Sequence, residues 1–105
     1  MGPHRRFPDP DAALRDRISR HAARLAFDGG RIDDAVAELR ELAHGRNDVL
    51  VEAGGVAVGA WITRRDLPHD LIAAALILAA TELPDKAELG RWISVGQRRA
   101  SMRRR

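Results

Sequence analysis

The sequence contains no cysteine, so disulfide bonds and thiolate metal sites are excluded, and this usage suits a reducing cytoplasm. A long apolar run is also missing. The most apolar stretch, residues 71–80, is far shorter than the ~20 residues that a membrane-spanning helix needs. The first ten residues are charged and rich in proline, which is unlike a signal peptide. We therefore expect a soluble, cytoplasmic protein with no membrane partner.

Motifs for catalysis and for nucleotide binding are absent as well. Neither the GxxxxGK[ST] phosphate loop nor the GxGxxG fingerprint occurs, and the four histidines stand singly, without the spacing of a metal site. Glu38 and Glu41 share a helical segment, but nothing nearby in the sequence would raise the pKa of either carboxyl group. The sequence therefore predicts a protein that is not an enzyme and that has no catalytic residue, no metal and no cofactor.

The charge is distributed unevenly along the chain. Eighteen basic and 15 acidic residues give a net charge of +3, but five of the arginines lie at residues 98–105. Residues 1–97 therefore hold 13 basic and 15 acidic residues, a net charge of −2. A basic end on a mildly acidic body can hold phosphate through counterion release, or it can serve only to keep the chain soluble.

Apolar residues recur at helical spacing in five segments, each bounded by residues typical of helix ends. The predicted helices run from Asp9-Pro10 to Asp28-Gly29-Gly30, from a cap at Asp33 or Asp34 to His44-Gly45, from a cap at Asn47 to about Thr63, from Pro68 to Ala80, and from Pro84 to Ala100. The first two are amphipathic and the other three are more apolar. The helix at 68–80 is apolar all round, so we expect it at the centre of the fold.

These segments predict an all-α fold, a compact bundle of about five helices. We expect one helical domain over residues 9–100, a disordered N-terminus at residues 1–8, and a basic C-terminal tail at residues 101–105.

Glycine interrupts the third predicted helix three times, at Gly54, Gly55 and Gly59. Each glycine costs up to about 1 kcal/mol relative to alanine, so the repetition indicates that another backbone approaches closely. We favour a neighbouring helix over a ligand as that backbone. The same stretch loosely follows a helix-turn-helix pattern with Gly55-Val56 at the turn. Its would-be recognition residues, 57–60, offer no hydrogen bond to base edges, which argues against base reading.

Arginine beside tryptophan marks the fifth predicted helix. Arg91 and Arg98 are seven residues apart and share one face, with Arg99 and Trp92 adjacent. Guanidinium groups beside a partly exposed aromatic ring form a surface for single-stranded nucleic acid; the alternative is that Trp92 belongs to the core and the arginines are solvated. Arg46 precedes the Asn47 cap, where a phosphate would meet both a guanidinium group and free helix amides. The predicted nucleic-acid-binding residues are Arg46, Asn47, Arg91, Trp92, Arg98, Arg99, Arg103, Arg104 and Arg105.

A set of short motifs carries a resemblance to a known family. These are Gly45-Arg46-Asn47-Asp48 followed by Leu50 and Ala53, then Leu67, Ala74-Ala75-Leu76, Ala79-Ala80, Leu83-Pro84 and Ile93-Ser94-Val95-Gly96. Over about residues 38–100 the chain resembles the helix-bundle domain that follows the catalytic domain in bifunctional DNA primase–polymerases of actinobacterial plasmids and phages. The family usually has Asn-Arg-Ala-Ala and an aromatic after the leucine, where this chain has Val51-Glu52-Ala53-Gly54-Gly55. The primase catalytic carboxylates are absent, so the resemblance implies an accessory role in DNA replication.

Two hypotheses follow from these patterns. The first is a non-catalytic accessory module of a mobile-element replication system, which binds single-stranded DNA or a replication protein such as a primase. The arginines supply affinity in this case, and no residue supplies base specificity. The second is a protein-interaction module, such as a regulator, an antitoxin or a phage inhibitor, which docks a protein partner or pairs with itself as a homodimer. The second hypothesis would be favoured by an exposed apolar patch that includes Trp61 or Trp92.

Overall fold

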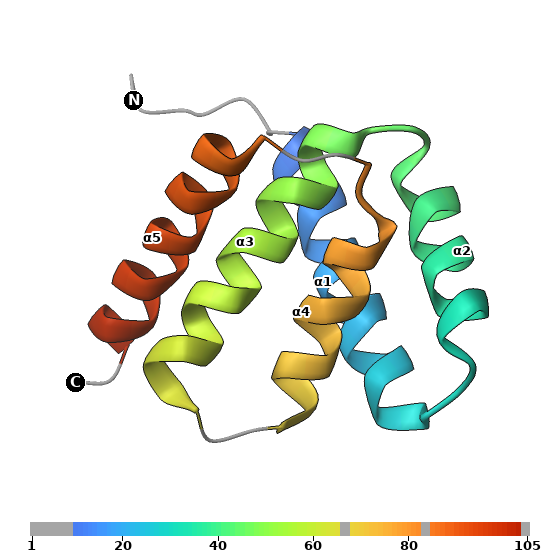
Figure 1. Ribbon diagram of the computed structural model, residues 1–105, viewed down its shortest axis with the longest axis horizontal. Helices are drawn as coiled ribbons and strands as arrows, with labels where there is room; N and C mark the ends of the chain where they lie inside the picture. Colours follow the sequence, from blue (N-terminus) through green and yellow to red (C-terminus); the bar gives the residue numbers. More distant parts are fainter. Residues whose placement is uncertain (1–9, 66–67, 83–84, 104–105) are drawn as a thin grey trace, which may run out of the picture.

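The computed structural model describes residues 10–65, 68–82 and 85–103, which form five α-helices and no strand (Figure 1). The helices are α1 (Pro10–Asp28), α2 (Ile32–Ala43), α3 (Asn47–Arg64), α4 (Pro68–Ala80) and α5 (Lys86–Arg103). The predicted all-α bundle is confirmed. The segment at residues 1–8, Pro84 and the last two arginines lie outside the described residues. Residues 101–103, predicted as part of a tail, continue α5.

The helix ends follow the predicted glycines, but the N-caps differ from the prediction. Gly29 and Gly45 have φ values of 70° and 78°, in the left-handed region that glycine adopts without strain. The residue that precedes α3 is Arg46, so Asn47 is the first helical residue and not the cap. Asp33 and Asp34 likewise lie in the first turn of α2, where their negative charges interact favourably with the helix dipole.

The hydrophobic core is built by α1, α2, α3 and α4. Its largest fully buried side chains are Ile18 of α1, Leu39 of α2, Val49 of α3 and Ile77 of α4. No residue of α5 belongs to this core cluster in the described part of the chain. The bundle therefore consists of a four-helix core and one added helix.

Within the core, α4 packs against α1, α2 and α3, as expected for a central helix. One face of α4 is nevertheless open to solvent, with Leu71 and Ile72 exposed to 40% and 46%. The helix that contacts all four others is α3, because it also carries α5. No described helix has the length and hydropathy needed to cross a membrane.

Gly55 and Gly59 of α3 mark the place where α5 packs, whereas Gly54 faces the side chain of Leu78 on α4. A Cβ atom on Gly59 would lie 2.0 Å from the carbonyl oxygen of Ile93, and one on Gly55 would lie 2.6 Å from the Cβ of Trp92. Both distances are too short for any side chain. The prediction that these glycines admit a neighbouring helix is therefore confirmed. α3 is also continuous through Gly55-Val56, so no helix-turn-helix is present there.

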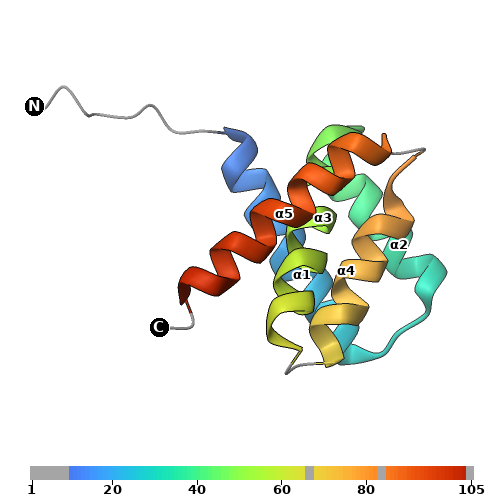
Figure 2. The ribbon, with the colours of Figure 1, turned by 60° about the vertical axis from the view of Figure 1, so that its left-hand side comes forward.

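α5 packs against α3 alone among the described helices. Figure 2 shows α5 crossing the outside of the bundle, with its C-terminal turns projecting away from α2 and α4. The side of α5 that faces away from α3 is consequently free of the rest of the bundle. This arrangement decides which of the predicted binding residues face solvent.

Candidate nucleic-acid interface

The start of α5 is fixed by Asp85, which precedes the first helical residue. Its carboxylate accepts a hydrogen bond from the backbone N–H of Ala87 at 3.2 Å, and its carbonyl oxygen accepts one from Leu89 at 2.9 Å. This is the pattern of an N-cap residue, which satisfies amides that have no partner inside the helix. Farther along, Gly96 and Ala100 are buried against α3, while Arg91, Ser94 and Arg98 are exposed.

α5 is also the basic element of the fold. It carries five basic residues and one acidic residue, a net charge of +4. By contrast, α2 carries four acidic residues and one basic residue, a net charge of −3. Of the five arginines at the C-terminus, Arg98, Arg99 and Arg103 therefore lie on α5.

Arg91, Trp92 and Arg98 are brought together on α5 as the spacing predicts. The Arg91 guanidinium carbon lies 5.7 Å from the centroid of the Trp92 ring, within the range of a cation–π interaction. Arg98 follows seven residues later, about 10 Å along the same helix. Both guanidinium groups are exposed, so the outer face of α5 presents two cations in a row.

Trp92 is half-buried. The sequence left open whether its ring is part of an exposed binding surface or part of the core, and the observed burial lies between these alternatives. Its Cβ faces Gly55 of α3, and its indole Nε1 is buried without a hydrogen-bond acceptor among the described residues. The polar edge of the ring is thus inserted between the helices. The flat group that this region offers to solvent is the Arg91 guanidinium, which lies over the ring.

Arg46 is held by carboxylates at the start of α3. It donates hydrogen bonds to Asp48 at 3.1 and 2.9 Å and to Asp11 of α1 at 3.0 Å. The hydrogen bond from Arg46 lowers the pKa of Asp48 and, with that to Asp11, raises the pKa of Arg46 above its ordinary value. An incoming phosphate would have to displace two carboxylates. The network therefore ties α1 to α3 and does not present a free guanidinium group.

Asn47 has a structural contact of its own. Its side chain donates to the carbonyl oxygen of Glu82 at 3.0 Å and accepts from the Glu82 backbone N–H at 2.7 Å. This pair of bonds attaches the segment after α4 to the beginning of α3. The side-chain amide of Asn47 is thereby committed, and no contact in the described chain joins Arg46 or Asn47 to the arginines of α5.

Arg99 points to a different part of the surface from Arg98. It lines a groove between α1, α3 and α5, together with Arg15 and Arg64, two arginines that we did not predict as binding residues. A sequence signal for this groove exists in hindsight. The residues Ala53, Val56 and Ala60 lie at helical spacing on α3, and such small side chains leave room beside a neighbouring helix. The side chains of Arg103, Arg104 and Arg105 are not described.

The two glutamates considered in the sequence analysis lie on the surface of α2. Glu38 and Glu41 are exposed on α2, and Glu38 contacts the His21 ring at 3.1 Å. No group of three metal-ligating side chains occurs in residues 10–65, 68–82 and 85–103.

Comparison with protein-family models, with curated protein sequences and with solved structures found no match to this chain.

Proposed function

We propose that this chain is a non-catalytic accessory module that binds single-stranded DNA through the outer face of α5. The observation that carries the proposal is the position of α5, a helix of net charge +4 that packs against one neighbour and exposes Arg91 and Arg98. Cations in a row attract a phosphate backbone by releasing its counterions. The replication system of a plasmid or phage is the context that the primase-domain resemblance implies.

The Arg91–Trp92 pair favours a single strand over a duplex. A guanidinium plane can stack on the face of a base, and only an unpaired strand presents its base faces. The ring beneath Arg91 limits the movement of the guanidinium group, because the cation is attracted to the ring. We therefore assign Arg91 to stacking and phosphate contact, and Arg98 to phosphate contact alone.

The roles proposed for the remaining residues follow from their contacts. Arg46 and Asn47 support the interface indirectly, because they hold α1 and the α4–α5 connection to the start of α3. Arg103 is the last residue of α5, and Arg104 and Arg105 add two positive charges after it in the sequence. We expect no base specificity, because the contacts that we assign to Arg91 and Arg98 are to phosphate and to the face of a base, and neither contact depends on which base is present.

The test is fluorescence anisotropy of a labelled oligonucleotide, offered as a single strand and as the matching duplex. We expect the single strand to bind more tightly, and we expect Arg91→Ala/Arg98→Ala to weaken that binding. The matched control is Arg17→Ala/Arg24→Ala, since these residues are exposed, lie seven residues apart on α1 and carry the same charge. Absence of binding by the intact chain would refute the proposal.

The alternative, a protein-interaction module, is favoured by a different observation. The end of α1 and the beginnings of α2 and α4 lie at one end of the bundle (Figure 1), and exposed apolar side chains occur there. Phe27 and Ile32 are exposed to 74% and 67%, and the Phe27 ring lies 5.6 Å from the His69 ring. Trp61 and Trp92, whose exposure would favour this alternative, are both half-buried.

Sedimentation velocity tests self-association through this end of the bundle. A dimer that dissociates in Phe27→Ser/Ile32→Ser, but persists in the exposed control Met102→Ser on α5, would support the alternative. The alternative predicts self-association at this end of the bundle. It would be contradicted if the protein were a monomer at all concentrations and the Phe27→Ser/Ile32→Ser variant bound DNA as the wild type does.

A further inference from the structure

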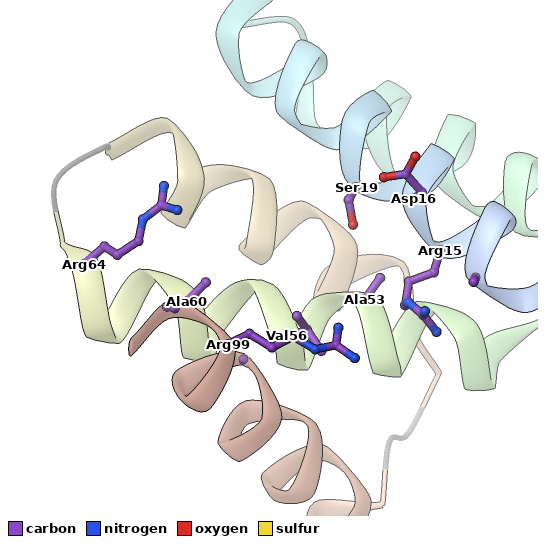
Figure 3. A pocket seen from close by; sticks show the side chains of 11 residues that line it. Arg15, Asp16, Ser19, Ala53, Val56, Ala60, Arg64 and Arg99 are labelled. Carbon is purple, nitrogen blue, oxygen red and sulfur yellow. The ribbon is translucent and has the colours of Figure 1, made fainter. Parts of the chain in front are cut away.

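A groove lies between α1, α3 and α5 (Figure 3), and neither Arg91 nor Arg98 lines it. Its volume of about 390 Å³ lies within the roughly 300–1,000 Å³ typical of pockets for small ligands. Small apolar residues line much of it: Ala12, Ala53, Val56, Ala60, Gly96 and Ala100. The groove exists because α1 and α5 both pack against α3 without packing against each other.

Three arginines, one from each of the three helices, also line the groove beside this apolar surface. Figure 3 shows Arg15 of α1 and Arg99 of α5 at one end of the groove, with their guanidinium groups directed toward the same space, and Arg64 of α3 at the other end. Arg15 is paired with Glu52, and Arg64 with Asp70 at 3.3 Å. Arg99 has no hydrogen bond or ion pair with any described residue.

The charges around the groove decide what kind of anion suits it. Burial raises the pKa of Glu52, and the positive charges of Arg15 and Arg99 oppose this shift, which places both guanidinium groups near one partly buried carboxyl group. Asp16 also lines the groove and is paired with Arg20 at 2.6 Å. Arg15, Asp16 and Arg64 are thus each paired with a side chain of opposite charge, whereas Arg99 has no such pair among the described residues.

We propose that this groove binds a small monocarboxylate, whose carboxylate pairs with Arg99 beside Arg15 and whose apolar body lies on the small side chains of α3 and α5. A planar guanidinium group matches a carboxylate in a bidentate pair. A phosphate dianion would bring a second negative charge toward Asp16 and Glu52, which the groove does not compensate. An uncharged apolar molecule would leave the Arg99 charge without a partner.

Hexanoate is a suitable probe, with hexanamide as its uncharged analogue and inorganic phosphate as the competing anion. In ¹H–¹⁵N correlation spectra of the full chain, we expect saturable shifts of the Ala60, Gly96 and Ala100 amides with hexanoate alone. Arg99→Gln should weaken hexanoate binding about tenfold or more, since hydrogen bonds to charged groups contribute about 1.5–3 kcal/mol. The neighbouring exposed variant Arg98→Gln should bind hexanoate as the wild type does.

A second variant separates loss of the site from loss of folding. Ala60→Leu places three additional carbon atoms in the groove and should block hexanoate while single-stranded DNA still binds. Conversely, Arg91→Ala/Arg98→Ala should lose DNA affinity and keep hexanoate. Equal shifts with hexanamide or phosphate, no saturation, or unchanged affinity in Arg99→Gln would overturn the proposal. Competition between the oligonucleotide and hexanoate would also overturn it, because the groove would then belong to the nucleic-acid surface.

Discussion

Val56 of α3 and Gly96 of α5 meet backbone to backbone, so closely that a Cβ atom on Gly96 would lie 2.1 Å from the Val56 carbonyl oxygen. Because α3 is the one described helix against which α5 packs, this contact helps to set the position of the whole of α5. It fixes the direction in which Arg91 and Arg98 face and the width of the groove that Arg99 lines. The proposed binding surfaces therefore depend on a residue that carries no functional group.

Gly96→Ala should destabilise the fold by about 1–3 kcal/mol, as insertion of a carbon atom into a closely packed contact does. The obstacle is backbone and not a flexible side chain, so α3 and α5 must separate. The matched control is Gly90→Ala, on the same helix, where an added Cβ would meet nothing within 4 Å. That control should be stabilised by up to about 1 kcal/mol, since alanine favours a helix. Urea denaturation measures both; equal effects of the two variants would contradict the close contact.

Asn47→Ala should lower the free energy of unfolding by about 1–2 kcal/mol, because two hydrogen bonds to the Glu82 backbone are lost. Asn47→Asp keeps the acceptor for the Glu82 N–H and loses only the donor, so its effect should be smaller. Hydrogen exchange of the Glu82 amide gives a local readout. That amide should exchange faster in Asn47→Ala and stay protected in Asn47→Asp, whereas unchanged exchange in Asn47→Ala would argue against the pairing.

Glu52 should make stability depend on pH. Burial raises its folded-state pKa above that of the unfolded chain, so folding favours the protonated form. The stabilising contribution is therefore complete below the unfolded pKa of about 4.3 and is lost as the pH rises through the folded pKa. Glu52→Gln cannot ionise and should gain stability relative to the wild type as the pH rises through this window.

A direct check is NMR titration of the Glu52 carboxyl carbon. Its pKa should lie above the usual glutamate range in the wild type. It should rise further in Arg15→Gln, because the Arg15 charge lowers it. A Glu52 pKa below the usual range would contradict the dominant role of burial.

The helices were predictable because local residues determine their ends. Gly29 and Gly45 adopt left-handed φ values just after α1 and α2, and Pro68 opens α4 as expected. The error at Asn47 has a physical cause. A side chain that suits an N-cap finds a better pair of partners in the backbone of Glu82, which is 35 residues away. Contacts at such separation are not visible in local spacing.

The candidate site was predictable only along a single helix. The shared face of Arg91 and Arg98 follows from helical periodicity, which the structure keeps. The carboxylates around Arg46 did not follow, because Asp11 reaches it from another helix. The groove could not be predicted in this way, because Arg15, Arg64 and Arg99 come from three helices and line one groove only after α5 packs on Gly55 and Gly59 of α3.

The salt dependence of single-stranded DNA binding tests the central proposal most directly. The logarithm of the binding constant falls with the logarithm of salt concentration by about 0.7 for each phosphate contact on a single strand. Loss of two contacts in Arg91→Ala/Arg98→Ala should therefore reduce the slope by about 1.4, and Arg17→Ala/Arg24→Ala should leave it unchanged. The same slope in the α5 variant as in the wild type, or a larger change in the α1 control, would contradict binding through α5.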